Sequence, residues 1–207
     1  YNSALQEGGG IYSSGQSVLC NCAFITNKAS YFGGAMSSHR SKAMVTGCTF
    51  VKNSSDGHAG GVCLAQDSST FTNCIFIDNS APLYLAGGSS LGGGLCVWDQ
   101  GDTILTNCGF FENSAGMGGG VFIGGSSIPK LSNCIFSNNL AADRGGGIFI
   151  LHDDCHPLLV NCTVVGNRSR LSGCGINNSP NGSPVLTNCI LWNNTDGSKM
   201  SESEQVS

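Results

Sequence analysis

Apolar residues along this chain follow a strand period rather than the three-and-four spacing of an amphipathic helix. The recurring order is Asn-Cys-x-Phe-x-x-Asn, and its Cys and Phe stand two residues apart, which places both side chains on the same face of a β-strand. The cysteines of this motif recur about every 26 residues: Cys22, Cys48, Cys74, Cys108, Cys134, Cys162 and Cys189. The first five repeats carry the phenylalanine: Phe24, Phe50, Phe76, Phe110 and Phe136. We expect both files to line one continuous core.

The repeat length selects the architecture. Three short strands and three turns account for about 26 residues, and successive coils of such a chain lie about 4.8 Å apart. The sequence therefore predicts an all-β fold, a right-handed single-stranded parallel β-helix (a solenoid) of about seven coils. The solenoid is expected to span residues 1–195, and residues 196–207 to form a polar C-terminal tail or a connection to a further segment.

Two further features repeat with the same period. Two or three glycines and an aliphatic residue begin one strand of each coil, and the aliphatic side chain is expected to point inward. The next residue then faces outward, and the sequence predicts a contact stripe there, consisting of Tyr12, Met36, Phe122 and Phe149. An Asn precedes the Cys of each repeat, with Gly47 as the exception, and both residue types tolerate a left-handed bend.

Composition excludes several classes of function. Charged residues make up 11% of the chain, whereas about 25% is typical of soluble domains. The net charge of -4 and the scattered Lys and Arg residues predict no nucleic-acid partner. Apolar runs stay far below the roughly 18 residues of a membrane helix, so no membrane span is expected.

Five of the 12 cysteines lie outside the inward file, and four of these are candidates for disulfides. Cys63 and Cys96 occupy the same register position in adjacent coils, within reach of a bond. Cys155 and Cys174 are the second candidate pair, although spacing alone does not determine connectivity. The inward cysteines themselves are interpreted as small buried apolar groups. A single file does not supply the closed set of four ligands that a structural metal needs, so no metal or cofactor is expected.

The repeats resemble a known family. Phe24-Ile25-Thr26-Asn27 followed by Gly33-Gly34-Ala35-Met36 is similar to the paired motifs in the passenger repeats of the chlamydial polymorphic outer membrane proteins. This resemblance covers nearly the whole chain. It implies a β-helix of the pectin-lyase-like type and an adhesin-type role at the cell surface.

The function predicted from these features is a non-catalytic structural or adhesive module of an extracellular or cell-surface protein, with a filament or larger assembly as its setting. Its expected partners are other proteins, including copies of itself, or a glycan or host surface. Asn181 and Asn193 are candidate glycosylation sites. The alternative is a polysaccharide-active enzyme of the pectin-lyase-like fold, for which the segment 152–156, with two His and two Asp, is the candidate chemistry. A solvated loop is the preferred interpretation of that segment.

Overall fold

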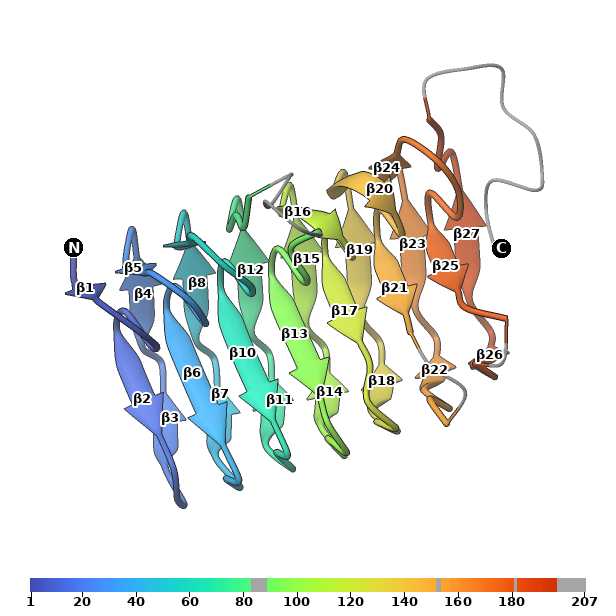
Figure 1. Ribbon diagram of the computed structural model, residues 1–207. Coiled ribbons are helices and arrows are strands. Elements are labelled where there is room, and N and C mark those ends of the chain that lie inside the picture. Colours follow the sequence, from blue (N-terminus) through green and yellow to red (C-terminus); the bar gives the residue numbers. More distant parts are fainter. Residues whose placement is uncertain (83–88, 152–153, 181, 197–207) are drawn as a thin grey trace.

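The computed structural model describes residues 1–82, 89–151, 154–180 and 182–196, and its strands stack into a single parallel solenoid (Figure 1). The described residues contain strands and turns but no helix. Each coil contributes one strand to each of three seven-stranded parallel sheets. The all-β parallel β-helix of about seven coils predicted from the sequence is therefore confirmed.

The three long sheets run along the solenoid axis. The glycine-led sheet follows the glycine motif and comprises β2 (Ile11–Ser13), β6 (Met36–His39), β10 (Val62–Ala65), β13 (Leu95–Trp98), β17 (Val121–Ile123), β21 (Ile148–Ile150) and β25 (Ile176–Asn178). The second sheet comprises β3 (Val18–Cys20), β7 (Met44–Thr46), β11 (Thr70–Thr72), β14 (Ile104–Thr106), β18 (Lys130–Ser132), β22 (Leu158–Val160) and β26 (Val185–Thr187). The third sheet comprises β4 (Ala23–Ile25), β8 (Thr49–Val51), β12 (Ile75–Ile77), β15 (Gly109–Phe111), β19 (Ile135–Ser137), β23 (Thr163–Val165) and β27 (Ile190–Trp192).

Two smaller sheets lie between the third sheet and the next glycine motif. The first consists of β1 (Ser3–Ala4), β5 (Lys28–Ala29) and β9 (Ser54–Ser55). The second consists of β16 (Ser114–Met117), β20 (Leu140–Arg144) and β24 (Arg168–Ser169). The last strand of the solenoid ends at Trp192, and residues 197–207 lie outside the described part, so the polar tail stays a prediction.

The core contains the files that the sequence predicts. Cys48, Cys74, Cys108, Cys134 and Cys162 are buried, whereas Cys22 and Cys189 are partly exposed because they lie in the first and last coils. The rings of successive phenylalanines from Phe24 to Phe136 stack with centroids 4.5–5.0 Å apart. This distance is close to the strand spacing of about 4.8 Å, so each coil places its ring directly over the last.

Asparagines shape two corners of each coil. The Asn before each inward Cys has a φ of 52–54°, and Gly47 takes the same place with a φ of 62°, which confirms the predicted left-handed bend. The Asn five residues after each Cys is buried in a ladder that includes Asn53, Asn79 and Asn113. In this ladder the backbone N–H and the side-chain Nδ2 of Asn79 both donate to Oδ1 of Asn113, each at 3.0 Å. Asn79 Nδ2 also donates to the Phe50 carbonyl oxygen of the coil before.

The register of the glycine-led sheet differs from the prediction at one residue. Met36 pairs with Ile11 on one side and Val62 on the other, and it is fully buried. Met36 therefore belongs to the inward file, and its assignment to the outer stripe is wrong. The reason is that Gly33 takes the place of the first of three glycines, with a φ of 63°, so Ala35 occupies the third glycine position. A Cβ at residue 33 would lie 2.1 Å from the Met36 carbonyl oxygen, so any other residue there would force the backbone to shift.

Candidate functional site

The outer face of the glycine-led sheet carries a hollow that opens to solvent. Its floor is the file of outward residues at the second position of each strand. In register order this file reads Tyr12, Ser37, Cys63, Cys96, Phe122, Phe149 and Asn177. Small side chains occupy the second to fourth places, and these lie beneath a cavity of about 400 Å³ that opens to solvent.

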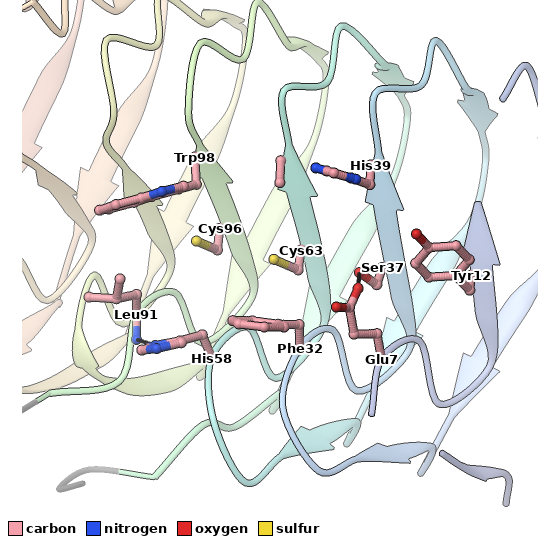
Figure 2. A pocket seen from close by; sticks show the side chains of 11 residues that line it. Glu7, Tyr12, Phe32, Ser37, His39, His58, Cys63, Leu91, Cys96 and Trp98 are labelled. Carbon is pink, nitrogen blue, oxygen red and sulfur yellow. Dashed lines mark hydrogen bonds between the residues drawn. The ribbon is translucent and has the colours of Figure 1, made fainter. Parts of the chain in front are cut away.

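Two further files form the walls of this groove (Figure 2). One wall consists of the residues that come directly before the glycine motif, namely Glu7, Phe32, His58 and Leu91. Parallel bridges join Glu7 to Phe32 and Phe32 to His58, so the wall follows the same register as the strands. The other wall consists of the last residues of β6, β10 and β13, which are His39, Ala65 and Trp98.

The chain fills the continuation of the groove with its own side chains. Phe122 is fully buried and Phe149 is 3% exposed, and they form a second apolar cluster with Cys63, Cys96 and Ala59. Leu91, Trp98, Met117 and Leu151 pack against this cluster, and the Trp98 ring stacks on Phe122 with centroids 5.4 Å apart. The predicted contact stripe is therefore wrong for Phe122 and Phe149, because neighbouring coils cover both rings. Tyr12 alone among its four members is exposed, at 55%.

Cys63 and Cys96 form the centre of the groove floor. They are directly paired between β10 and β13, as the sequence predicts, and both are free thiols in the structure. The neighbouring Cys63 thiol and burial raise the pKa of Cys96 well above its usual value, so this thiol is protonated at neutral pH. The disulfide between them stays a prediction.

Cys155 and Cys174 are not brought together. Cys155 follows the end of β21, where its Sγ donates to the Leu151 carbonyl oxygen at 3.0 Å. Cys174 precedes β25, where its Sγ lies 3.3 Å from Ser169 Oγ. Since adjacent strands run parallel, the two thiols lie at opposite ends of the glycine-led sheet. The proposed pairing of these two cysteines is wrong for this geometry.

The polar groups of the groove are few and are held by specific contacts. Ser37 Oγ donates to Glu7 Oε2 at 2.9 Å, which positions the carboxylate beside Tyr12 at one end. His58 Nδ1 accepts a hydrogen bond from the Leu91 backbone N–H at 3.1 Å, and its ring stacks on Phe32. Burial lowers the pKa of His58 below its usual 6.5, so the imidazole is neutral at physiological pH.

The walls of this groove are not evident from residue types in the sequence. Phe32, His58 and Leu91 do not form a motif by residue type, because their side chains share no chemistry. Their common property is position, because each directly precedes the residue that takes the first place of the glycine motif. Counting back from that place in every repeat would have identified the file.

The remaining candidates from the sequence are two glycosylation sites and the loop at residues 152–156. Asn193 is exposed, as a glycosylation acceptor must be, whereas Asn181 lies outside the described residues. Of the loop weighed as catalytic, His152 and Asp153 also lie outside them. Within the described part of the chain, no group of three or more His, Cys, Asp or Glu side chains is arranged to hold a metal ion. In the same part, no helix is long and apolar enough to cross a membrane.

Comparison with known proteins agrees with the geometry. Residues 33–207 match the family described as "Right handed beta helix region". The chain belongs to this family. The match covers most of the solenoid and assigns its hand, which confirms the right-handed winding predicted from the repeat.

Other comparisons add little to this assignment. No curated protein matches the chain. Among solved structures it is similar to QnrB1, a plasmid-mediated fluoroquinolone resistance protein, at 11% sequence identity and a TM-score of 0.29, over 94% of this chain and 90% of that one. A likeness of this size carries no argument about function.

Proposed function

We propose that the chain is a non-catalytic structural and adhesive module of an extracellular or cell-surface protein, acting through side-by-side contacts with other copies of the solenoid. The observation that carries this proposal is the outer face of the third sheet. The third position of its three-residue strands forms a largely apolar file along all seven coils, and the first position adds three exposed isoleucines. A β-helix fold fits a structural or surface module of this kind.

The first file is mixed in character, whereas the second is apolar at every place except Ser137. The first contains Ile75, Ile135 and Ile190, which are 40–60% exposed, at the same register positions as Thr49 and Thr163. The second is made of Ile25, Val51, Ile77, Phe111, Ser137, Val165 and Trp192. The second sheet also has one largely aliphatic outward file, but Lys130 interrupts it and the other outward file of that sheet is rich in threonine. The contact surface is therefore assigned to the third sheet rather than to the stripe on the glycine-led sheet.

The size of this face indicates the strength of the contact. Seven three-residue strands make a surface of about 34 Å by 10 Å, or about 340 Å². A stable interface buries about 800 Å² on each partner, so one pair of solenoids associates weakly. A long array of coils is then held by many such contacts at once. The low content of charged residues, 11%, weakens the electrostatic repulsion between neighbouring rods.

The groove supports the non-catalytic part of the proposal. Glycoside hydrolysis uses two carboxyl groups, about 5 to 9.5 Å apart. Glu7 is the one carboxylate among the residues that line the groove. The alternative, a polysaccharide-active enzyme, therefore lacks its second group at this site.

The extracellular part rests on sequence features. The similarity of the paired Phe and Gly motifs to the repeats of chlamydial polymorphic outer membrane proteins supports a surface role. Asn193 is exposed within an Asn-Asn-Thr sequon, which suits glycosylation in a host that performs it. The direct pairing of Cys63 with Cys96 is compatible with a disulfide in an oxidising environment.

The test measures self-association by sedimentation velocity over a wide concentration range. Wild type is expected to show a sedimentation coefficient that rises with concentration. The double variant Ile75→Lys with Ile135→Lys is expected to remain monomeric, because the charged lysine side chains disrupt the apolar face. The control, Thr46→Lys with Thr106→Lys, adds the same charge at the same spacing on the second sheet and is expected to associate like wild type.

Three results would contradict the proposal. A wild-type chain that stays monomeric at millimolar concentration has no lateral contact. An equal loss of self-association in both double variants would assign the effect to net charge rather than to the third sheet. Release of reducing ends from polygalacturonate by the purified chain would favour the enzyme instead.

A further inference from the structure

The groove on the glycine-led sheet is filled in one half and open in the other. In the fifth and sixth coils its floor position holds Phe122 and Phe149, whose ring centroids lie 5.8 Å apart and which are buried in the second apolar cluster. In the second to fourth coils the same register position holds Ser37, Cys63 and Cys96, and the cavity of about 400 Å³ lies above them. The walls continue past the point where the filling stops. The chain thus shows which chemical group fits this channel, namely a phenyl ring lying between the two walls.

We propose that the open half of this groove binds a small arylalkylamine, with its aromatic ring over Cys63 and Cys96 and its ammonium group at Glu7. The cavity is within the range of about 300–1,000 Å³ that is usual for ligand pockets. The floor positions from Tyr12 to Cys96 span three coil steps, or about 14 Å along the axis. The site therefore accommodates an elongated molecule that lies parallel to the solenoid axis.

The ring end of the site is apolar and aromatic. Figure 2 shows Cys63 and Cys96 between the wall of Phe32, His58 and Leu91 and the opposite wall that ends at Trp98. Trp98 already stacks on Phe122, so a ligand ring over Cys96 would extend the row of Phe122 and Phe149 by one member. Apolar groups of this kind favour a planar hydrocarbon ring that displaces water from both walls.

The other end of the site selects positive charge. Glu7 is the one acidic side chain among the lining residues, and the bond from Ser37 Oγ holds it at the mouth of the groove. Tyr12 and Phe32 flank this end and add aromatic faces, which attract cations. His58 is neutral and its Nδ1 is already used by Leu91, so it does not repel an ammonium group. An amine is therefore preferred to a neutral or anionic group of the same shape.

The first experiment is isothermal titration calorimetry of the purified chain with 2-phenylethylamine, with 2-phenylethanol as its neutral counterpart. Fluorescence gives a second readout. The chain has two tryptophans, and the exposed Trp192 is removed by Trp192→Phe so that Trp98 alone reports on the groove. We expect saturable binding of the amine, tighter than that of the alcohol, with a change in Trp98 emission.

The first variants introduce a phenylalanine at the floor position, as the chain itself has in the fifth and sixth coils. Cys63→Phe and Cys96→Phe each place a ring at the register position that Phe122 and Phe149 occupy in later coils. Both variants are therefore expected to fold and to bind the amine more than about tenfold more weakly. Cys63→Ser keeps the small floor residue and is expected to bind like wild type. Glu7→Gln is expected to weaken binding of the amine about tenfold and to leave binding of the alcohol unchanged, since it removes a charge-assisted hydrogen bond. Far-ultraviolet circular dichroism and the melting temperature establish that each variant is folded.

The inference is overturned by any of three results. One is the absence of saturable amine binding to wild type at millimolar ligand. Another is undiminished binding to folded Cys63→Phe and Cys96→Phe variants. The third is equal affinity for amine and alcohol, which would remove the role of Glu7. None of these results bears on self-association through the third sheet, because the two sites lie on different sheets.

Discussion

Truncation of one asparagine in the middle of the buried ladder tests how far polar contacts hold this solenoid together. Asn113→Ala removes a side chain that makes four hydrogen bonds. Its Oδ1 accepts from the backbone N–H and the Nδ2 of Asn79, and its own Nδ2 donates to the Phe76 carbonyl oxygen and to Asn139 Oδ1, all at 3.0 Å. Because Asn113 is fully buried, water does not replace these partners in the folded state.

The expected loss follows from these contacts. A hydrogen bond contributes about 0.5–1.5 kcal/mol net, and a buried donor left without a partner costs about 1–3 kcal/mol. The variant leaves the Asn79 backbone N–H without its acceptor and removes the donor to Phe76. We therefore expect Asn113→Ala to lower the free energy of unfolding by about 3–5 kcal/mol.

Urea denaturation followed by circular dichroism and by tryptophan fluorescence measures this loss. The two probes must give coincident transitions, because solenoids can unfold in segments. Asn2→Ala is the matched control, since Asn2 begins the same ladder but is exposed, and its Nδ2 donates to Asn27 Oδ1. The control is expected to lose less than about 1 kcal/mol.

Equal losses in the free energy of unfolding for Asn113→Ala and Asn2→Ala would refute the stabilising role of the buried hydrogen bonds. A loss below about 1 kcal/mol at Asn113 would mean that the ladder sets the shape of the turn without contributing stability. Apolar packing would then be the only large stabilising contribution in this part of each coil.

Two further changes test the core and the groove wall. Phe110→Ala should lower the free energy of unfolding by about 3–5 kcal/mol through the cavity it leaves, whereas Phe111→Ala, on the outer face of the same strand, should cost much less in the same urea titration. Burial lowers the pKa of His58, so the unfolded chain binds the proton more readily, and stability should fall as the pH drops through about 6.5. Urea midpoints at pH 7.5 and 5.5 should therefore differ more in wild type than in His58→Gln, and an unchanged difference would contradict the assignment.

Much of this fold can be predicted from the sequence, because it depends on local features of each repeat. The two-residue spacing of Cys and Phe fixes which side chains share a strand face, and its repetition fixes the number of coils. The bends are equally local, since Asn and Gly47 mark positions at which the backbone adopts a positive φ. The pairing of Cys63 with Cys96 follows from counting within one repeat. These features need no knowledge of what lies beside each strand.

The ladder of buried asparagines shows where local reasoning becomes incomplete. The sequence shows that Asn79 and Asn113 recur at the end of the repeated motif, just after the strand that carries Phe. The donation of both Asn79 nitrogens to one Oδ1 of Asn113 depends on the stacking of two coils. Polar residues at a turn are usually exposed, so their complete burial is a property of the stack.

The sequence by itself determined the winding, the inward files and the left-handed bends, because each follows from strand alternation and from the φ angles that a residue tolerates. Tertiary structure alone decided what covers the outside. Met36 joins the core because its partners Ile11 and Val62 set the register, and Phe122 and Phe149 are buried because segments from neighbouring coils fold over them. The open groove over Cys63 and Cys96 arises in the same way. An outward side chain is exposed or covered according to the path of residues far away in the sequence, and no local pattern encodes that path.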